Sequence, residues 1–524
     1  MTSLNISARL VQQPTATVLI PCSGSSAQAV SAAQLLDGCR RTAEALHDAG
    51  VRRGHKAVVM TRDPYEFVAA VYALHTLGAV PVLSEPRADV RRCLDEVAPE
   101  VFIGEPLAHL GRRILGWGRG HVRVPLVTGR AFPGRGLLLG RGLALPVPDG
   151  SGPPPDIKEP APGDLAMIAF TSGSTGRPKG VEYRYSTLAG QLTALATVLK
   201  PQPGDILLSG FLPITLIGPL LGLTTIAPAI NHLAPARTPP EHLVTPVQQH
   251  QATAILASPA VLAVITRHCA RHRLTLPSVN RVLSFGAPLR PGLADALADV
   301  LQPNAEILSV YGATECLPVS VISARDLRAL PPAGHAGTCL GRPLAGLRAR
   351  ILDADPTGLG EIAVAGPVVS PAYHARPDSN AAAKSFADCG LLHRTGDLGR
   401  LDGQGRLWYL GRKADLVTGD GFSLTTEDVE KAADAAPGVR RTALVGIGPA
   451  GRQQPVLCVE TRSHTGPDIT VASARAALDH HPQGHRVQHI VVHPRFPTDH
   501  RHNSKIDRIR LSAWAARRLR RIER

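Results

Sequence analysis

The chain has 524 residues, more than one hydrophobic core normally holds together, so the sequence predicts several domains. Hydrophobic residues make up 44% of the chain, which suits a globular fold, whereas aromatic residues make up only 4%. The formal net charge of +15 would attract nucleic acid, anionic substrates or an acidic partner. No stripe of basic and aromatic residues accompanies that charge, so we do not expect nucleic acid as a partner.

The cysteines and the apolar segments predict a cytoplasmic protein without a transmembrane segment. Eight cysteines are spread singly, with no C-x-x-C pair and no metal-ligand spacing, so we expect free thiols in a reducing compartment. The N-terminal run TVLIPC is too short for a signal sequence. The longest apolar candidate, Ile206 to Ile230, is interrupted by prolines and glycines. We interpret it as loops and a short buried helix that line a pocket.

Helices and strands are predicted to alternate through the first part of the chain. Residues 31–50 carry apolar side chains at helical spacing and end on Gly50, which suits a helix C-terminus. Residues 56–60 and 79–83 predict buried strands, and residues 64–78 predict a second helix between them. This alternation favours an α/β fold in which helices cover sheets.

The remaining chain is predicted to contain a linker and three further regions. Residues 132–163 are rich in Gly and Pro and predict a surface linker between two subdomains. The α/β alternation then resumes through the segments ATAILAS, RVLSFGAPL and AEILSVYGATE. Residues 346–411 contain short strand-like runs, which predict a small β-rich subdomain. After Arg412 the sequence predicts a helix capped by Thr426 with acidic residues in its first turn, followed by strands of a small unit.

The most informative segment is TSGSTGRPKGV, from Thr171 to Val181, which follows the apolar run LAMIAF. Backbone N–H groups and hydroxyls of such a loop can surround a polyphosphate, while Lys179 supplies a point charge. The segment is not a Walker A loop, because Pro178 precedes Lys179, and it contains no G-x-G-x-x-G pattern. The apolar run before it is typical of a buried strand and favours a phosphate loop over a flexible surface turn.

This segment resembles the phosphate loop of the adenylate-forming superfamily, which includes acyl-CoA synthetases, peptide-synthetase adenylation domains and luciferases. Five more segments resemble other signatures of the family in its order, namely SFGAPL (284–289), YGATE (311–315), TGDLG (395–399), GRKAD (411–415) and NSKIDR (503–508). The resemblance covers nearly the whole chain.

The resemblance implies an α/β fold in three parts. A large N-terminal adenylation domain, residues 1–411, contains two α/β subdomains and the β-rich subdomain. A hinge at residues 412–415 leads into a small, mobile α+β lid domain, residues 416–524, which carries Lys505.

The resemblance also implies a reaction that activates a carboxylate. The carboxylate attacks the α-phosphate of ATP, which gives an acyl-adenylate and pyrophosphate, and cations must lie where charge develops. Mg²⁺ bridges the phosphates with Glu315 as its protein ligand, and Lys505 stabilises the transferred charge. Tyr311 stacks on adenine and Asp397 accepts hydrogen bonds from the ribose hydroxyls. Arg412 reaches the ribose or a phosphate from the domain junction.

The implied site residues fall into two overlapping sets. The nucleotide-binding residues are Thr171, Ser172, Gly173, Ser174, Thr175, Gly176, Lys179, Gly286, Ala287, Pro288, Tyr311, Gly312, Thr314, Asp397 and Arg412, and the catalytic residues are Lys505, Glu315, Lys179 and Thr171. Taken singly, several have plainer interpretations, since a lone tyrosine usually packs in a core and a TGD segment also suits a turn. Their order within one family pattern favours the functional interpretation.

Three departures from the family pattern concern the acceptor of the acyl group. The segment FLPITLIGPLLGL lacks the aromatic-His pair that many acyl-CoA synthetases carry at the mouth of the acyl pocket. Ala414 occupies a hinge position that usually holds Asp or Lys, and VTGDGFSLTTEDVE lacks the usual Lys-x-x-Gly run. These departures argue against CoA as the acceptor and against a lid that moves into a thiol-accepting state.

Several segments closely resemble the β-lactone synthetases of bacterial long-chain olefin and β-lactone biosynthesis, namely YGATECLPVS, PGVRRTALVGIG, QQPVLCVE and HPRFPTDHRHNSKIDR. This resemblance implies ATP-dependent adenylation of a (2-alkyl-)3-hydroxy fatty acid, followed by attack of its own β-hydroxyl. The products would be a β-lactone, AMP and pyrophosphate. The base that takes the hydroxyl proton is left open between a freed phosphate oxygen and a nearby histidine.

Two other functions remain open from sequence. One is an acyl-CoA ligase or a fatty acyl-AMP ligase that loads a carrier protein. The other is a non-catalytic scaffold that kept the fold, against which the intact set of Lys179, Glu315, Asp397, Arg412 and Lys505 argues. The resemblance also leaves open a homodimer and an assembly with other enzymes of the same pathway.

Overall fold

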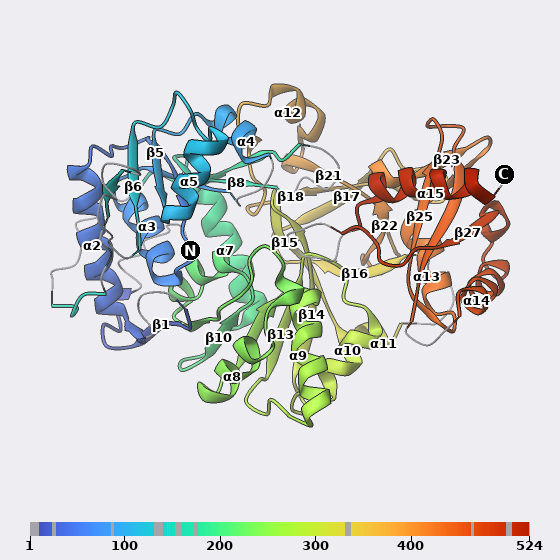
Figure 1. Ribbon diagram of the computed structural model, residues 1–524, viewed down its shortest axis with the longest axis horizontal. Helices are drawn as coiled ribbons and strands as arrows, with labels where there is room; N and C mark the ends of the chain where they lie inside the picture. Colours follow the sequence, from blue (N-terminus) through green and yellow to red (C-terminus); the bar gives the residue numbers. More distant parts are fainter. Residues whose placement is uncertain are drawn as a thin grey trace. The chain divides into compact units, whose positions relative to one another are not determined.

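The computed structural model describes residues 10–23, 28–84, 89–129, 140–143, 145, 147–151, 160–171, 177–330, 337–462, 466–498 and 506–522. The chain divides into two compact units (Figure 1). The N-terminal unit contains Met1–Ala324, Leu344–Leu347 and Ala365–His393, and the C-terminal unit contains Arg325–Pro343, Arg348–Val364 and Arg394–Arg524. The mixed α/β architecture confirms the predicted fold class. The predicted hinge at 412–415 lies inside the C-terminal unit, and the domain division at Arg412 stays a prediction.

The first sheet of the N-terminal unit has eight strands in the order β19-β9-β8-β4-β3-β5-β6-β7. Its strands are β3 (Lys56–Met60), β4 (Val80–Leu83), β5 (Val101–Gly104), β6 (Val124–Val127), β7 (Arg141–Gly142), β8 (Leu165–Phe170), β9 (Gly180–Arg184) and β19 (Ala372–Tyr373). The connecting helices are α2 (Ala32–Asp48), α3 (Pro64–Thr76), α4 (Val90–Val97) and α5 (Pro106–Leu115). The predicted strands at 56–60 and 79–83 and the helices around them are therefore confirmed.

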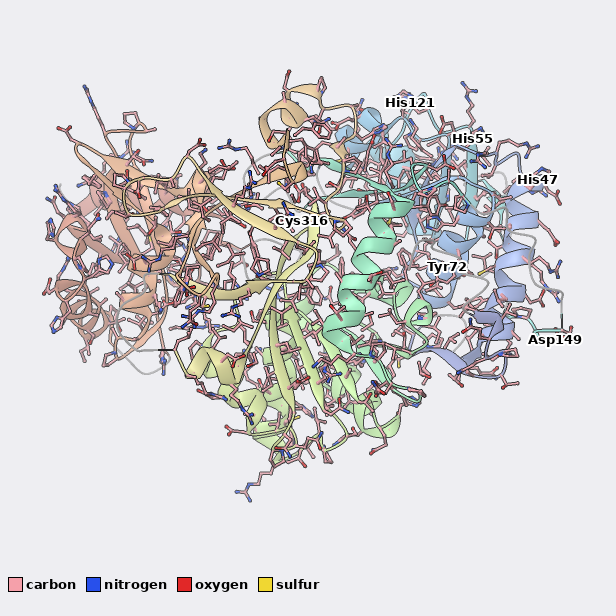
Figure 2. The ribbon with its side chains drawn as sticks, turned by 180° about the vertical axis from the view of Figure 1, so that it is seen from behind. His47, His55, Tyr72, His121, Asp149 and Cys316 are labelled. Atoms are coloured by element: carbon pink, nitrogen blue, oxygen red, sulfur yellow. The ribbon has the colours of Figure 1, made fainter. Side chains whose placement is uncertain are left out.

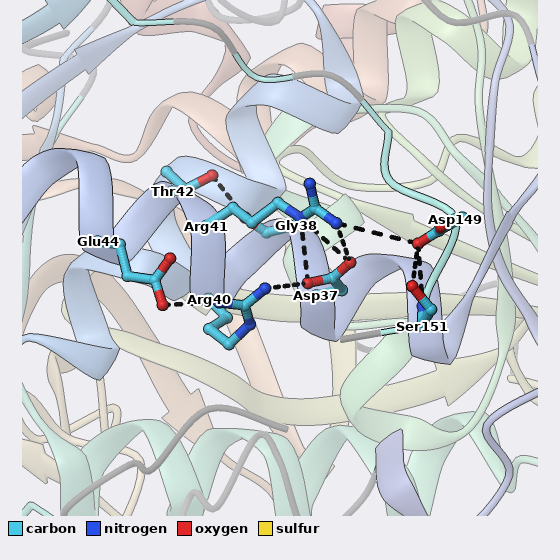
Figure 3. Close-up of polar contacts among 8 residues, drawn as sticks. All are labelled: Asp37, Gly38, Arg40, Arg41, Thr42, Glu44, Asp149 and Ser151. Atoms are coloured by element: carbon cyan, nitrogen blue, oxygen red, sulfur yellow. Dashed lines mark hydrogen bonds and ion pairs between the residues drawn. The ribbon is translucent and has the colours of Figure 1, made fainter. Parts of the chain in front are cut away.

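Helix α2 begins where its sequence provides a cap. The Ser31 hydroxyl accepts from the amide of Gln34, and the Gln34 side chain accepts from the amide of Ser31. Further along the helix, the buried carboxylate of Asp37 pairs with Arg40 at 2.8 Å and with Arg41 at 3.1 Å (Figure 3). This pairing explains how a charged side chain can lie in the face that packs on the core.

The second sheet of the N-terminal unit contains, in order, β15-β14-β13-β12-β10-β11-β1-β2. Its strands are β1 (Thr17–Pro21), β2 (Val30–Ser31), β10 (Ile206–Ser209), β11 (Thr224–Ala227), β12 (Ala254–Ala257), β13 (Arg281–Phe285), β14 (Glu306–Ala313) and β15 (Cys316–Ser323). Helices α7 (Tyr185–Leu199), α8 (Glu241–Gln249), α9 (Pro259–His272) and α10 (Pro291–Ala298) accompany them. The side chains of β12, β13, α9 and α10 share one core, which makes this half a packed α/β layer.

Residues 206–230 were predicted to form loops and a short buried helix, and the structure differs from this prediction. The structure places two parallel strands there, β10 and β11, separated by two 3₁₀ turns, Leu212–Leu216 and Pro219–Leu221. Tyr72 of helix α3 (labelled in Figure 2) donates from its hydroxyl to the carbonyl of Leu216 at 2.6 Å. A four-residue strand between prolines has too little pattern to be recognised from sequence.

The C-terminal unit contains a sheet in the order β17-β18-β21-β22-β16 and a three-stranded sheet β25-β26-β27. The strands are β16 (Thr338–Pro343), β17 (Arg348–Leu352), β18 (Gly360–Ala365), β21 (Gly390–Leu401), β22 (Leu407–Arg412), β23 (Val417–Gly419), β24 (Phe422–Leu424), β25 (Val439–Ile447), β26 (Gln454–Thr461) and β27 (His489–Val492). Its helices are α11 (Ala324–Arg328), α13 (Thr426–Asp434), α14 (Pro467–Asp479) and α15 (Arg508–Ile522), and the short elements α12 (Pro377–Ala383) and β20 (Lys384–Ala387) belong to the N-terminal unit. The β-rich region between residues 346 and 411 is as predicted.

Four smaller predictions have different outcomes. Helix α13 has Thr425 as its N-cap, one residue before the predicted Thr426, which is already helical. All eight cysteines are free thiols, as predicted. In the part of the chain that the structure describes, no helix is long and apolar enough to cross a membrane. Most of the predicted linker 132–163 lies outside the described residues.

Candidate active site

The base of the phosphate-loop segment is a β-hairpin in the N-terminal unit. Strands β8 and β9 pair antiparallel, with Phe170 opposite Gly180. The Thr171 amide donates to the carbonyl of Lys179 at 3.0 Å, and the Lys179 amide donates to Thr171 Oγ1 at 3.1 Å. These bonds join the two described ends of the segment and hold the backbone of Lys179 beside Thr171. Residues 172–176, which include the predicted Ser172, Gly173, Ser174, Thr175 and Gly176, lie outside the described residues.

The Lys179 ammonium lies over an aromatic ring that the sequence did not single out. Lys179 Nζ is 4.6 Å from the centroid of Tyr373. Tyr373 belongs to the two-residue strand β19, which pairs with β9 so that Tyr373 stands opposite Val181. The amide of His374 then donates to the Gly180 carbonyl at 2.7 Å, which extends the pairing to the end of the loop.

The same tyrosine contacts the carboxylate predicted to bind the metal ion. Tyr373 Oη donates to Glu315 Oε1 at 2.6 Å. Glu315 occupies the turn between β14 and β15, just before Cys316 (labelled in Figure 2). Cys316 forms an antiparallel bridge with Val369, and the Ser370 amide donates to the Glu315 carbonyl at 2.8 Å. Both the backbone and the side chain of Glu315 are therefore held by the segment that leads to Tyr373.

Electrostatics keep Glu315 ionised. Burial acts to raise the pKa of its carboxyl, but His393, the Tyr373 hydrogen bond and Lys384 together hold that pKa below its ordinary value. Lys384 donates to the carbonyl of Ser370 at 2.7 Å and to its hydroxyl at 3.2 Å. Burial lowers the pKa of Lys384 to about 8. No motif pointed to Tyr373, Lys384 or His393, which the fold gathers around Glu315.

A single carboxylate with this environment fits a magnesium ion that arrives with a nucleotide. Among the described residues, no three His, Cys, Asp or Glu side chains gather into a metal cage. Mg²⁺ is usually held by one or two carboxylates together with substrate phosphates. Glu315 would supply the hard, ionised oxygen ligand that such a site needs, and this role stays a prediction.

The predicted adenine slot lies at the ends of two neighbouring parallel strands. Strands β13 and β14 pair with Phe285 opposite Val310, so Gly286 directly follows the end of β13 and Tyr311 is the next residue along β14. Gly286 has φ +91°, which a residue with a side chain rarely adopts. A Cβ on Gly312 would lie 2.6 Å from Leu317 Cδ1 and 2.8 Å from the Cys316 carbonyl. Both glycines are thus needed for the shape of this edge.

The remaining members of these motifs lie in the same stretch of backbone. Ala287 and Pro288 follow Gly286 in the turn after β13. The carbonyl of Thr314 accepts a short hydrogen bond from the Tyr183 hydroxyl on β9. Tyr183 and Tyr373 share one small hydrophobic core with Val181. The phosphate-loop hairpin therefore braces the YGATE turn as well as Lys179.

In the C-terminal unit, the structure pairs Asp397, predicted to bind ribose, with Arg412, predicted to reach the ribose or a phosphate. Asp397 on β21 stands opposite Arg412 on β22, and Arg412 Nη1 lies 2.7 Å from Asp397 Oδ1. Arg412 also donates to the carbonyl of Thr395 at 3.1 Å. Asp397 is only 6% exposed, and its amide donates to the Thr395 hydroxyl at 3.1 Å. The two motif residues form one rigid pair, and their roles toward a nucleotide stay predictions.

Lys505 lies outside the described residues, but the described residues before and after the undescribed stretch 499–505 are held together. Thr498 and Ile506 form an antiparallel bridge, and the Asp507 amide donates to the Pro497 carbonyl at 2.9 Å. Arg508, the last residue of NSKIDR, pairs with Glu430 of α13 at 2.6 Å and with Asp415 at 3.4 Å. Burial acts to lower the pKa of Arg508, but the carboxylates of Glu430 and Asp415 raise it.

Comparison with known proteins agrees with this arrangement. The family described as AMP-binding enzyme matches residues 6–374. The chain is 40% identical over 497 residues to the olefin beta-lactone synthetase of Stenotrophomonas maltophilia (strain K279a). This alignment covers 90% of this chain and 88% of the relative. It is 39% identical over 499 residues to the olefin beta-lactone synthetase of Xanthomonas campestris pv. campestris, with the same two shares.

A solved structure is similar over nearly the full length. The amide bond synthetase McbA from Marinactinospora thermotolerans has a TM-score of 0.80 and 23% sequence identity, over 98% of this chain and 99% of McbA. At that identity the likeness shows the fold alone. It extends across both units, whereas the family match ends at residue 374.

Proposed function

The chain belongs to the family of AMP-binding enzymes and is an AMP-forming ligase, and on this premise we propose that it makes β-lactones from 3-hydroxy fatty acids. The observation that carries the proposal is the 40% and 39% identity, over 90% of the chain, to two enzymes named olefin beta-lactone synthetase. Their names give the product class, and the bond that closes a β-lactone ring joins a carboxyl carbon to the oxygen of a 3-hydroxyl.

The first step joins the acid to AMP. A carboxylate oxygen attacks the α-phosphorus of ATP, and pyrophosphate leaves with the electron pair of the broken P–O bond. Lys179 would bind the phosphates from the hairpin base, and Glu315 would hold Mg²⁺, which neutralises phosphate charge when bound. Lys505 would stabilise the charge on the α-phosphate. The environment of Glu315 supports this assignment, because its carboxylate stays ionised beside a fixed hydrogen-bond donor.

The second step closes the ring within one substrate molecule. The β-hydroxyl oxygen attacks the acyl carbonyl, the hydroxyl proton is taken up, and AMP leaves from the carbonyl carbon. Intramolecular attack requires only orientation and exclusion of water, since both reacting groups are already in the site. The base that takes the proton is either an oxygen of the departing phosphate or a histidine.

The hinge supports an acceptor that is part of the substrate. Lys413 pairs with Glu361 at 2.9 Å and Asp415 pairs with Arg508, so both neighbours of Ala414 are tied to the C-terminal unit. A thiol acceptor needs a second site and usually a reoriented lid. Ala414 lacks the charged side chain that the family usually carries at this hinge position, which supports an acceptor carried by the substrate itself.

Product analysis with two matched acids tests this function. We expect a 2-alkyl-3-hydroxy acid to give lactone, AMP and pyrophosphate with ATP and Mg²⁺, at a rate that added CoA does not change. We expect the same acid without its 3-hydroxyl to give one equivalent of bound acyl-AMP and then to stall. Mass spectrometry and the infrared carbonyl stretch identify the product. Rapid CoA-dependent conversion of the deoxy acid to a thioester would contradict lactone formation and establish an acyl-CoA ligase.

A further inference from the structure

We propose that Tyr373 is a positioning residue that holds the phosphate-loop lysine and the metal-binding carboxylate apart in the arrangement that MgATP requires. The inference rests on the roles proposed above for Lys179 and Glu315. It concerns the adenylation half of the reaction, which does not depend on the acceptor of the acyl group.

The geometry gives one side chain two separate contacts. The hydroxyl of Tyr373 donates to Glu315 Oε1 at 2.6 Å, and the face of its ring carries the Lys179 ammonium at 4.6 Å. The hydroxyl and the ring face of a tyrosine point in different directions, so the anion and the cation are held on different sides of one rigid group.

Rigidity is built into the backbone around Tyr373. Strand β19 pairs with β9 directly after Lys179, and the Tyr373 amide donates to the Asn380 side chain at 2.7 Å. On the other side, Val369 and Ser370 are bonded to Cys316 and Glu315. The side chain of Tyr373 is 5% exposed and has little freedom to move away.

The physical reason for such a spacer is the charge of its two neighbours. A lysine and a glutamate that share one site attract each other and would form a direct ion pair. Each charge would then neutralise the other, and ATP would have to break that pair before it could bind. With Tyr373 between them, the lysine stays available for phosphate oxygens and the carboxylate for a cation.

Two substitutions separate the two contacts. Tyr373→Phe keeps the ring and removes the hydroxyl, so we expect the affinity for MgATP to fall ~10–100-fold, as when the hydrogen-bond partner of a metal-ligating carboxylate is lost. Affinity for ATP in excess EDTA should be nearly unchanged. Tyr373→Leu removes both contacts and should weaken the binding of both MgATP and metal-free ATP. Isothermal titration measures the two affinities, and pyrophosphate release gives the matching KM and kcat.

Tyr185→Phe is the matched control. The Tyr185 hydroxyl is a buried hydrogen-bond partner of His75 Nδ1 at 2.8 Å in the same unit, so its loss has a similar structural cost. A purely structural role for Tyr373 would lower stability in both variants and leave the ratio of MgATP to ATP affinity at the wild-type value. A wild-type ratio in Tyr373→Phe would therefore overturn the proposal.

Glu315→Gln distinguishes failure of the inference from failure of its premise. If Glu315 holds the metal ion, this variant should also lose the preference for MgATP over ATP. A wild-type preference in Glu315→Gln would remove Glu315 from the metal site, and with it the proposed role of Tyr373. The lactone proposal is judged separately, because its test measures the product and not nucleotide binding.

Discussion

Two partly buried cations lie beside the segments that carry the two predicted catalytic lysines, and their surroundings differ. Lys384 of the N-terminal unit lies 5.7 Å from the ring of Tyr373, which also carries Lys179. Its hydrogen-bond acceptors are the neutral carbonyl and hydroxyl of Ser370, and burial lowers its pKa to about 8. Arg508 of the C-terminal unit follows Lys505 and pairs with two carboxylates, which raise its pKa.

The difference shows what each cation contributes. A buried arginine with paired carboxylates ties its segment down, because removing one partner leaves the others charged and unpaired. A lysine whose acceptors are neutral loses hydration without gaining a carboxylate partner, so its charged form is destabilised. Its positive charge nevertheless helps to lower the pKa of Glu315. We therefore expect Arg508 to act on stability and Lys384 to act on the electrostatics of its surroundings.

The largest expected effect is that of Arg508→Met. Breaking a buried ion pair by removing one partner typically costs ~3–5 kcal/mol, because Glu430, 3% exposed, would be left without its partner. Hydrogen–deuterium exchange should show helix α13 and strand β25 opening ~10²–10⁴-fold more often. Arg510→Met on the same helix removes an exposed ion pair with Asp507. It should change the free energy of opening that exchange measures by less than ~1 kcal/mol. Equal exchange in the two variants would show that Arg508 does not anchor this segment.

The next largest effect is that of Lys505→Ala on adenylation. Loss of one group that stabilises transition-state charge typically costs ~10²–10³-fold in rate. ATP affinity should remain close to wild type, because this lysine is expected to act late. Pyrophosphate release and ATP titration measure the two quantities, with Lys200→Ala, an exposed lysine in the other unit, as the control. Unchanged adenylation turnover would exclude Lys505 from the site.

The segments proposed to carry the chemistry could be recognised from sequence, but the contacts between them could not. TSGSTGRPKGV and YGATE have residue types at fixed spacing, so each segment identifies itself. The alternation of apolar helices and strands likewise predicted the α/β fold. Tyr373 lies in PVVSPAYHARPD, where nothing in the pattern suggests a phosphate or a metal ion.

The reason is that the position of Tyr373 depends on pairing between distant strands. Strand β19 has only two residues and joins β9, which lies about 190 positions earlier in the chain. The same holds for Arg508 and Asp415, whose pairing depends on how the strands and helices of the C-terminal unit fold together. The pairing of Asp397 with Arg412 needed the register of β21 and β22, although each residue was identified from its own motif.

The pH dependence of stability tests whether the charged form of Lys384 destabilises the folded chain. The pKa of Lys384 falls from the ordinary 10.5 to about 8, so between those values the unfolded chain binds more protons and stability rises with pH. At pH 7 the full cost is present, about 3 kcal/mol at about 1.4 kcal/mol for each pKa unit. Lys384→Met should therefore be more stable than wild type at pH 7. The gain is this cost reduced by about 1 kcal/mol, because the variant loses the hydrogen bonds to Ser370.

This gain should shrink as the pH rises from 8 toward 10.5, and it should vanish above 10.5, where Lys384 is neutral in both the folded and the unfolded chain. Urea midpoints of variant and wild type at pH 7 and pH 10 measure the difference, and Lys200→Met serves as an exposed control. A difference between variant and wild type that is the same at both pH values would show that Lys384 is not buried as a costly cation.

An effect of similar size concerns Asp397, where the C-terminal unit again pairs a cation with a carboxylate. If Asp397 accepts hydrogen bonds from ribose, Asp397→Ala should weaken AMP binding by ~1.5–3 kcal/mol, or at least ~10-fold in Kd. If it only holds Arg412, the variant should lose stability and keep its AMP affinity. Asp402→Ala is the matched control, because Asp402 on the same hairpin bonds Arg406 and Trp408 at 2.7 and 2.9 Å. Titration of AMP into both variants decides the matter. Equal, wild-type affinity in the two would make the pair of Asp397 and Arg412 a purely structural one, like that of Glu430 and Arg508.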